Sequence, residues 1–303
     1  MTRAHLVAAT LAISLVSVHA RPHQDAAQSA GSSTVVYALA VDDKNAPVTD
    51  LTPADFVVKE DGKTRQILSA EPATARLQIA VLVDDNGTGI FRYGVGQFAQ
   101  RLQGRADISL RVVTEQVRTI TDFTDNVQDW INGIAQLGVR PSTPEGGQLL
   151  EGVSEASLAL KKREASRPVI LALTVGGEEH STLQAKHVLD QLHESRAALY
   201  VLFAGNSAVR SASAAARPSE LLDSNHNLDQ VLGEGPKQSG GRRKDVIATQ
   251  ALLTDLQQIA GDLNAQYAIK YVRPADRNAP QKLQVSVQRK GVNVFAPTRA
   301  PLR

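Results

Sequence analysis

A cluster of small polar residues follows an apolar run in the first third of the chain. The run is LQIAVLVD, residues 77–84, and the cluster consists of Asp84, Asp85, Asn86, Gly87 and Thr88. Carboxylate, amide and hydroxyl oxygens are the ligands that hard cations such as Mg²⁺ prefer. A carboxylate can also act as a nucleophile in phosphoryl transfer. The spacing therefore leaves three interpretations open: a metal site, a catalytic aspartate, or a plain turn after a buried strand.

Alternating strand and helix patterns surround this cluster. Continuous apolar runs, typical of strands buried on both faces, occur at 77–84, 168–175 and 197–205. Further strand patterns occur at 107–113 and 116–121, and apolar residues recur at helical spacing in 91–103, 126–137, 147–163, 182–196 and 251–266. Strands that alternate with helices of this length predict a mainly parallel sheet covered on both faces. We therefore expect a doubly wound α/β domain, with the cluster at the carboxyl end of its first strand, where such domains bind ligands.

Residues on either side of this domain have β character. Segment 34–75 contains a hairpin signal at Asp61-Gly62, and segment 267–303 contains short alternating runs around a turn at Lys290-Gly291. We expect the two segments to form one small antiparallel β unit beside a domain that spans 76–266. Within that domain, residues 206–243 are rich in small and polar residues and should form a mobile excursion.

The amino-terminal residues resemble an export signal. Arg3 precedes an apolar stretch, and Val18-His19-Ala20 has the small-x-small pattern of a cleavage site, so residues 1–20 are predicted to be a signal peptide. Residues 21–33 are predicted to be a disordered leader. No later segment is apolar enough to span a bilayer. We expect an exported protein, periplasmic or extracellular.

Composition excludes several classes of function. The 33 Lys and Arg residues nearly balance the 31 Asp and Glu residues, which gives no electrostatic reason to expect binding to nucleic acid. The chain contains no cysteine, and this excludes disulfides, thiol catalysis and thiolate metal sites.

Three segments carry a resemblance to a known family. They are VDDKNAPVTDLTPADFVVKEDG (41–62), LQQIAGDLNAQYAIKYVRP (256–274) and VSVQRKGVNVFA (285–296). Together they resemble the bacterial exported VWFA-related proteins that are common in Acidobacteria. The resemblance implies a von Willebrand factor type A core and a role in protein binding. It also implies a metal-ion-dependent adhesion site, whose first motif, Asp-x-Ser-x-Ser, corresponds here to Asp84-x-Asn86-x-Thr88.

The other two parts of such an adhesion site depart from the family pattern. Where the family places Gly-Gly-Thr, this chain has Gly146-Gly147-Gln148, and Thr143 is out of register. Where the family places Thr-Asp-Gly, this chain has Val175 after Thr174, and valine offers no side-chain oxygen. The resemblance thus implies an incomplete, vestigial site for Mg²⁺ or Mn²⁺, with ligands Asp84, Asn86 and Thr88. Nearby acids could partly compensate, namely Asp85, Glu145, Glu178 and Glu179.

We expect the strand-end loops to form the binding face for a protein partner that the sequence does not identify. Its predicted residues are Asp84, Asp85, Asn86, Thr88, Thr143, Glu145, Gln148 and Glu178. The first hypothesis is an exported, non-enzymatic interaction module that needs no cofactor. The second is a metal-dependent binder that uses Mg²⁺ or Mn²⁺.

Two further hypotheses remain. The order Asp84-x-Asn86-Gly87-Thr88 also resembles the first motif of haloacid dehalogenase-type phosphatases, Asp-x-Asp-Gly-Thr. In that motif the second aspartate is the general acid, and Asn86 cannot donate and retrieve a proton at neutral pH. A purely structural role for the α/β domain, as a spacer between the two β segments, is the last hypothesis.

Overall fold

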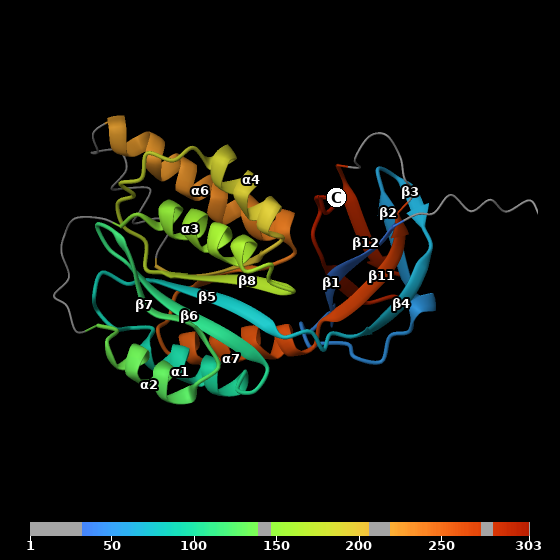
Figure 1. Ribbon diagram of the computed structural model, residues 1–303, viewed down its shortest axis with the longest axis horizontal. Coiled ribbons are helices and arrows are strands. Elements are labelled where there is room, and N and C mark those ends of the chain that lie inside the picture. The colour runs from blue at the N-terminus through green and yellow to red at the C-terminus, as the bar shows by residue number, and fades with distance from the viewer. Residues whose placement is uncertain (1–31, 139–146, 206–218, 274–280, 303) are drawn as a thin grey trace, which may run out of the picture.

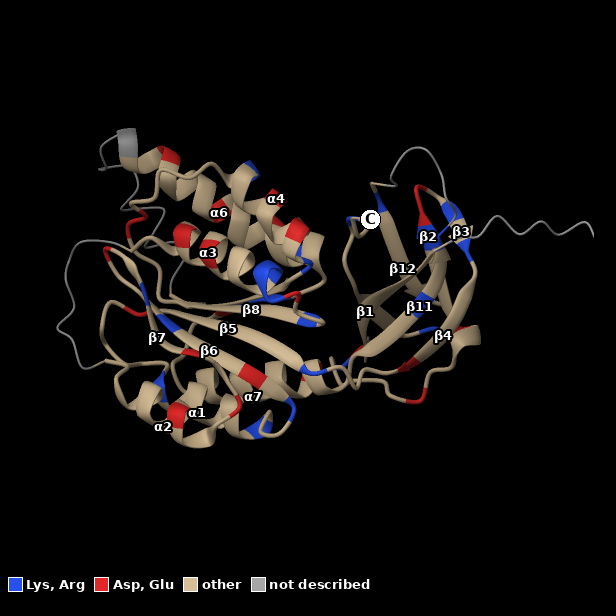
Figure 2. Ribbon diagram, viewed as in Figure 1, with Lys and Arg blue, Asp and Glu red and all other residues tan. Residues whose placement is uncertain are grey.

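The computed structural model describes residues 32–138, 147–205, 219–273 and 281–302. The predicted signal peptide, and the leader up to residue 31, lie outside these ranges. The described residues form an α/β domain and a smaller all-β unit, which lie side by side (Figure 1). Acidic and basic residues occur in both parts (Figure 2).

The α/β domain is built on a six-stranded sheet with the order β10-β9-β8-β5-β6-β7. All neighbouring pairs are parallel except β6 and β7, so β7 is an antiparallel edge strand. The strands are β5 (Leu77–Asp84), β6 (Ala106–Val113), β7 (Val117–Thr124), β8 (Arg167–Thr174), β9 (Ala198–Ala204) and β10 (Arg243–Val246). The doubly wound α/β class predicted from the sequence is confirmed.

Helices cover both faces of this sheet (Figure 1). One face packs against α1 (Arg92–Arg101), α2 (Val127–Ala135) and α7 (Ala251–Asn264), and the other against α3 (Leu149–Lys162), α4 (Ala185–Ser195) and α6 (Ser219–Ser239). The central strand β5 supplies both cores, because Ile79 and Val81 face the first layer while Ala80 and Leu82 face the second. A strand buried on both faces must be apolar along its length, which explains its unbroken run. Within the described ranges, no helix combines the length and the hydropathy that a membrane crossing requires.

The all-β unit combines both ends of the chain, as predicted. Its two antiparallel sheets have the orders β13-β1-β11-β4 and β12-β2-β3. The strands are β1 (Ser32–Asp42), β2 (Phe56–Glu60), β3 (Lys63–Arg65), β4 (Ile67–Pro72), β11 (Tyr267–Arg273), β12 (Leu283–Val287) and β13 (Val292–Phe295), with a short 3-10 helix at Pro53–Asp55. The hairpin at Asp61-Gly62 has positive φ at both residues, 46° and 79°, as a type I′ turn requires. The first strand begins at Ser32, so the end of the predicted leader belongs to the sheet.

The prediction that residues 206–243 form a mobile excursion is largely wrong. Residues 219–239 form α6, and β10 begins at Arg243. Leu228, Val231 and Leu232 are buried in the core that α6 shares with α4 and β9. These few apolar residues lie at helical spacing, but the polar residues between them conceal the pattern in the sequence. Residues 206–218 lie outside the described ranges.

A buried carboxylate joins the two sheets of the β unit. Glu60 is fully buried at the end of β2, and its Oε1 accepts hydrogen bonds from Tyr271 Oη and Arg273 Nε, both at 2.8 Å. Its Oε2 accepts a hydrogen bond from Arg65 Nε at 3.0 Å. Since Tyr271 and Arg273 come from β11 and Arg65 from the β2–β3 hairpin, one side chain connects the beginning of the chain to its end.

Replacing Glu60 by alanine should therefore destabilise the protein strongly. We expect Glu60→Ala to lower the free energy of unfolding by about 3 kcal/mol or more, because it leaves the buried guanidinium of Arg273 without its carboxylate. Chemical denaturation followed by circular dichroism measures this. The matched control is Glu71→Ala on the exposed end of β4, where a loss below about 1 kcal/mol is expected. Equal losses for the two variants would contradict the role assigned to Glu60.

Candidate functional site at the carboxyl edge of the sheet

Asp84 lies at the carboxyl end of β5, in the middle of the sheet and almost out of contact with solvent. Only 7% of its surface is exposed, and its Oδ2 accepts a hydrogen bond of 2.6 Å from Thr174 Oγ1 on the neighbouring strand β8. The two residues are directly paired in the parallel ladder. Burial raises the pKa of Asp84 to about 6, and the nearby Asp85 adds to this, while the hydrogen bond from Thr174 opposes it.

The residues after Asp84 form a tight turn whose acidic side chain points inward. Asp85 is 3% exposed, and its Oδ1 accepts a hydrogen bond from the Gly87 N–H at 3.0 Å. The Thr88 hydroxyl donates to the Asp85 carbonyl oxygen at 2.8 Å. Asn86 and Gly87 have φ values of 51° and 73°, the left-handed region that asparagine and glycine adopt at the lowest cost. Asp85 Oδ2 is buried and has no hydrogen-bond partner among the described residues.

Two further loops converge on the Asp84 carboxylate. The Gly147 N–H donates to the Glu178 carbonyl oxygen at 3.0 Å, and the His180 N–H donates to the Gly147 carbonyl oxygen at 3.0 Å. These bonds connect the loop before α3 to the loop after β8. A Cβ atom at position 147 would lie 3.1 Å from Asp84 Oδ1. Glycine therefore lets the backbone pass directly beside the carboxylate.

Glu179 is the second buried carboxyl group of the site. It is 1% exposed and accepts backbone hydrogen bonds from Leu149 and Leu150 at the start of α3, at 3.0 and 3.4 Å, and from Ser181 at 3.3 Å. Burial raises its pKa to about 8; the N–H groups of Leu149 and Leu150 oppose the rise, and the negative charge of Asp84 adds to it. Glu179 thus supplies the side-chain cap of α3, since Gln148 at the N-cap position makes no such bond.

The structure brings most of the predicted binding-face residues to this edge of the sheet. Asn86 and Gln148 are half-buried and Thr88 is exposed. Glu178 is half-buried, with its Oε2 3.8 Å from His180 Nε2. Thr143 and Glu145 lie outside the described residues. The sequence placed Glu178 on the face and named Glu179 only as a compensating acid, yet Glu179 is the one that is buried and whose charge interacts with that of Asp84. Two adjacent acids on a loop carry no pattern that would distinguish them.

The donor set at this edge does not fit an adhesion-type metal cage. Mg²⁺ requires oxygen ligands in a nearly octahedral arrangement. The hydroxyls of Thr88 and Thr174 are directed to the Asp85 carbonyl and the Asp84 carboxylate, and Val175 contributes no side-chain oxygen. Across the described part of the chain, no group of three or more His, Asp or Glu side chains is arranged to hold a metal ion.

Comparison with known proteins finds similarity of fold. No protein-family model matches the sequence, and no curated protein is significantly similar to it. Similar solved structures include proximal thread matrix protein 1 from the mussel byssus with a zinc-occupied MIDAS motif, at 10% identity and a TM-score of 0.48, covering 66% of this chain and 48% of that one. A von Willebrand factor type A structure from Catenulispora acidiphila has 8% identity and a TM-score of 0.47, covering 80% and 72%. Manganese-loaded Plasmodium vivax TRAP protein has 11% identity and a TM-score of 0.43, covering 77% and 98%.

These similarities concern the arrangement of helices and strands alone. The chain spans about half the length of the mussel protein that it matches. A von Willebrand factor type A domain is among the solved structures similar to this chain, as the sequence predicted.

The raised pKa of Glu179 should make stability depend on pH. The folded protein holds a proton on this group up to about pH 8, whereas the unfolded chain releases it near pH 4 to 5, so stability should fall as pH rises through this interval. Asp84 adds to this pH dependence only up to about pH 6, where its own carboxyl group ionises in the folded protein. Between about pH 6 and pH 8 we expect a loss on the order of 2 kcal/mol in the free energy of unfolding.

Replacing the ionisable group tests this expectation. Glu179→Gln cannot ionise and should flatten the dependence above pH 6, whereas Glu178→Gln on the same loop should retain it. Urea denaturation in a chelating buffer at several pH values measures both slopes. An unchanged slope in Glu179→Gln would show that another group is responsible.

Proposed function

We propose that the protein is an exported, non-enzymatic interaction module that binds a protein partner through the carboxyl edge of its α/β sheet without a metal ion. One observation carries this proposal. Three acids at this edge, Asp84, Asp85 and Glu179, are buried, while the nearby Asn86, Thr88 and Gln148, which reach solvent, are uncharged. Glu115 and Glu178 are acids of the same edge that reach solvent. A polar face with few unpaired charges is inexpensive to desolvate when a partner docks. Its loops are also fixed by backbone hydrogen bonds, so little ordering is required on binding.

Export is proposed on the amino-terminal pattern, in which a basic residue and an apolar stretch precede Val18-His19-Ala20. The partner would accordingly be a periplasmic or extracellular protein. The near-neutral charge supports a partner other than nucleic acid.

Site-specific photo-crosslinking tests the binding face. A photoreactive amino acid in place of Thr88 should crosslink a partner in cells of the source organism. The same amino acid in place of Lys162, exposed in the last turn of α3 at the opposite edge of the sheet, should not. Asp84→Ala should then weaken binding of the captured partner at least about tenfold while the protein stays folded, because the buried carboxylate fixes the loop. Crosslinks from position 162 alone, or unchanged affinity in Asp84→Ala, would remove this face from the proposal.

A metal-dependent version of the same role is the second candidate. It is favoured by Asp85 Oδ2, which is buried without a hydrogen-bond partner among the described residues. If a cation binds, Asp84, Asp85 and Asn86 are the residues that would hold it, and its charge would offset the mutual repulsion of the acids.

Calorimetric titration distinguishes the two versions. For the metal-independent module we expect no saturable heat with Mg²⁺, Mn²⁺ or Ca²⁺ at concentrations up to about 1 mM, since the donor set is incomplete. Saturable binding that is lost in Asp84→Ala would instead establish the metal-dependent version. Hydrolysis of phosphate esters in the presence of Mg²⁺ would overturn both versions and favour the phosphatase alternative.

A further inference from the structure

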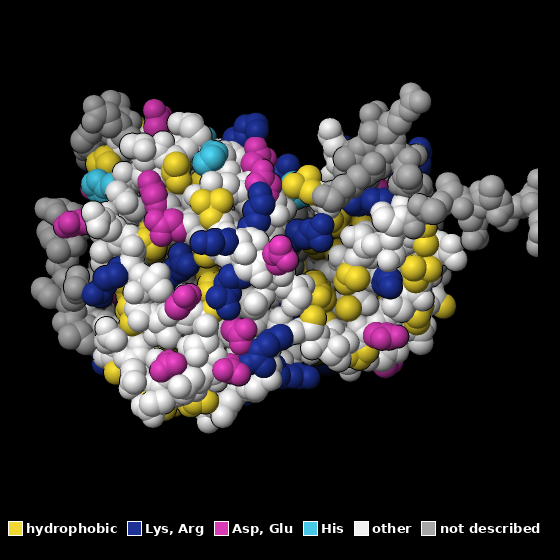
Figure 3. All heavy atoms as spheres, viewed as in Figure 1, with side chains coloured by type: hydrophobic (Ala, Val, Ile, Leu, Met, Phe, Trp, Pro, Cys, Tyr) yellow, Lys and Arg dark blue, Asp and Glu magenta, His cyan; other side chains and the backbone are white. Residues whose placement is uncertain are grey.

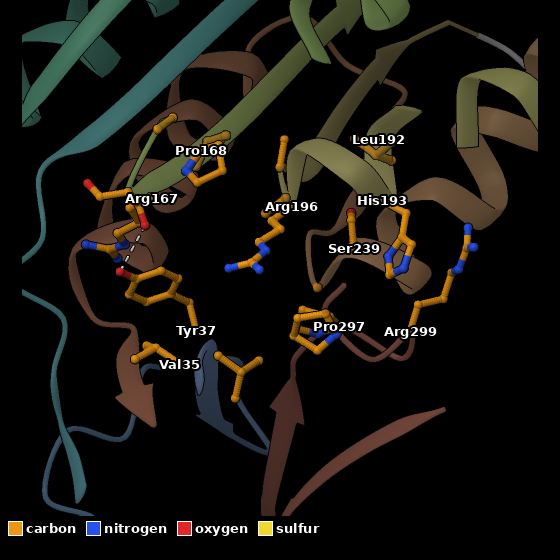
Figure 4. A pocket seen from close by; sticks show the side chains of 18 of the residues that line it. Val35, Tyr37, Arg167, Pro168, Leu192, His193, Arg196, Ser239, Pro297 and Arg299 are labelled. Atoms are coloured by element: carbon orange, nitrogen blue, oxygen red, sulfur yellow. Dashed lines mark hydrogen bonds between the residues drawn. The ribbon is translucent and has the colours of Figure 1, made fainter. Parts of the chain in front are cut away.

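A cavity of about 400 Å³ lies at the junction of the α/β domain and the β unit, away from the carboxyl edge. Its walls come from β1, from the start of β8, from the end of α4 and from the segment after β13 (Figure 4). Cavities of this size between domains are preferred places for small-molecule ligands.

One wall of the cavity is rigid. The Tyr37 hydroxyl on β1 donates to the Ser166 carbonyl oxygen at 3.2 Å, and the Arg167 guanidinium lies 5.3 Å from the centre of the Tyr37 ring. Arg167 is itself buried and donates to Gln266 Oε1 at 2.8 Å and to the carbonyl oxygens of Ala73 and Leu263. All its nitrogens have partners within the protein, so Arg167 holds the two units together and is not available for a ligand.

Arg196 differs from Arg167 in having an incomplete set of partners. Its side chain extends into the space between Tyr37 and Pro297 (Figure 4). There it donates to the Leu302 carbonyl oxygen at 2.8 Å, and no carboxylate of the described residues pairs with it. Its backbone is left-handed, with φ of 57°, a conformation that costs a non-glycine residue on the order of 1 kcal/mol. This left-handed conformation at the end of α4 directs the Arg196 guanidinium into the cavity.

The surroundings of Arg196 are positively charged. Arg299 and His193 lie on the same side of the cavity, and Arg299 is partly neutralised by Asp190 at 3.2 Å. Burial lowers the pKa of His193; the charges of Arg299 and Arg196 add to this, and those of Asp190 and Glu194 oppose it. The only acid among the lining residues that the structure describes is Glu164, which is exposed.

The remaining lining is mixed, with the polar residues Ser33, Thr34, Gln238 and Ser239 beside an apolar part. In the apolar part, Val35 near the start of β1 is 41% exposed, and Leu192 and Pro297 face the same space. Basic side chains gather on the α/β domain near the junction, and hydrophobic side chains are spread over the facing part of the β unit (Figure 3). A ligand that fits must therefore combine a negative group with an apolar body.

We infer that this cavity binds a small amphipathic carboxylate, whose carboxyl group pairs with Arg196 and whose apolar part packs against Val35, Leu192 and Pro297. An arginine fork matches a carboxylate with two parallel hydrogen bonds. Because the cavity walls belong to both units, the bound molecule would join them and stabilise the folded chain. This inference does not depend on the proposed protein-binding role, since the two sites lie at opposite ends of the parallel sheet.

Isothermal titration of the full-length mature protein with octanoate tests the inference, with octanol as the uncharged counterpart. Octanoate should bind saturably and octanol at least about tenfold more weakly, the difference expected for a charge-assisted hydrogen bond. Arg196→Gln should weaken octanoate binding by a similar factor. The matched control, Arg118→Gln on the distant strand β7, should leave it unchanged.

A second variant fills the cavity without removing the charge. Val35→Trp places a large ring into the open space from an exposed position, so folding should be retained while octanoate binding is lost. Absence of saturable octanoate binding to the unmodified protein would overturn the inference. Equal binding of octanol, or full octanoate binding in both Arg196→Gln and Val35→Trp, would overturn it as well.

Discussion

The parallel pairing of β5 between β6 and β8 is the constraint on which the rest of the structure depends. It buries both faces of the strand and forces Asp84 to the carboxyl edge, opposite Thr174. The chain that leaves this edge after Asp84 must satisfy its backbone N–H and C=O groups within a short turn, and this turn uses positive φ values. Gly147 lies beside the Asp84 carboxylate because a larger residue would crowd it. The site is thus a consequence of the order in which the strands are paired.

Burying carboxyl groups at this edge has an energetic cost, and the structure offsets only part of it. Asp84 has a hydroxyl donor, and Glu179 has three backbone donors, two at the start of α3 and one at Ser181. No arginine or lysine pairs with either of them in the described ranges, and the pKa of each is raised. The buried acids therefore shape the loops from inside, and the uncharged side chains of Asn86, Thr88 and Gln148 lie toward solvent. In an adhesion-type metal cage, the same acids would have to converge on one ion.

The second organising feature is the pairing of strands from the N-terminal and C-terminal segments in one β unit. Strand β1 lies between β11 and β13, and Glu60 bonds to side chains from both halves of the β unit. The β unit therefore needs chain segments from both sides of the α/β domain. The junction that results is held by Arg167 and Tyr37, yet it is not filled. A cavity remains where helix α4 ends, and Arg196 extends into it. Both candidate sites are therefore products of connections between elements rather than of the elements themselves.

The sequence by itself determined the fold class, the order of strands and helices apart from α6 and β10, the β unit made from both chain ends, and the position of Asp84 at a strand end. Each of these follows from local periodicity and from turn residues such as Asp61-Gly62, which need no distant partner. Helix α6 was not predicted because only three of its apolar residues, Leu228, Val231 and Leu232, belong to the core cluster, among many polar neighbours. Only the tertiary structure decided that Glu179, rather than Glu178, is buried beside Asp84, and that Arg196 lines a cavity. Which side of a loop or a junction a residue faces depends on contacts with segments far away in the chain, and local periodicity contains no information about them.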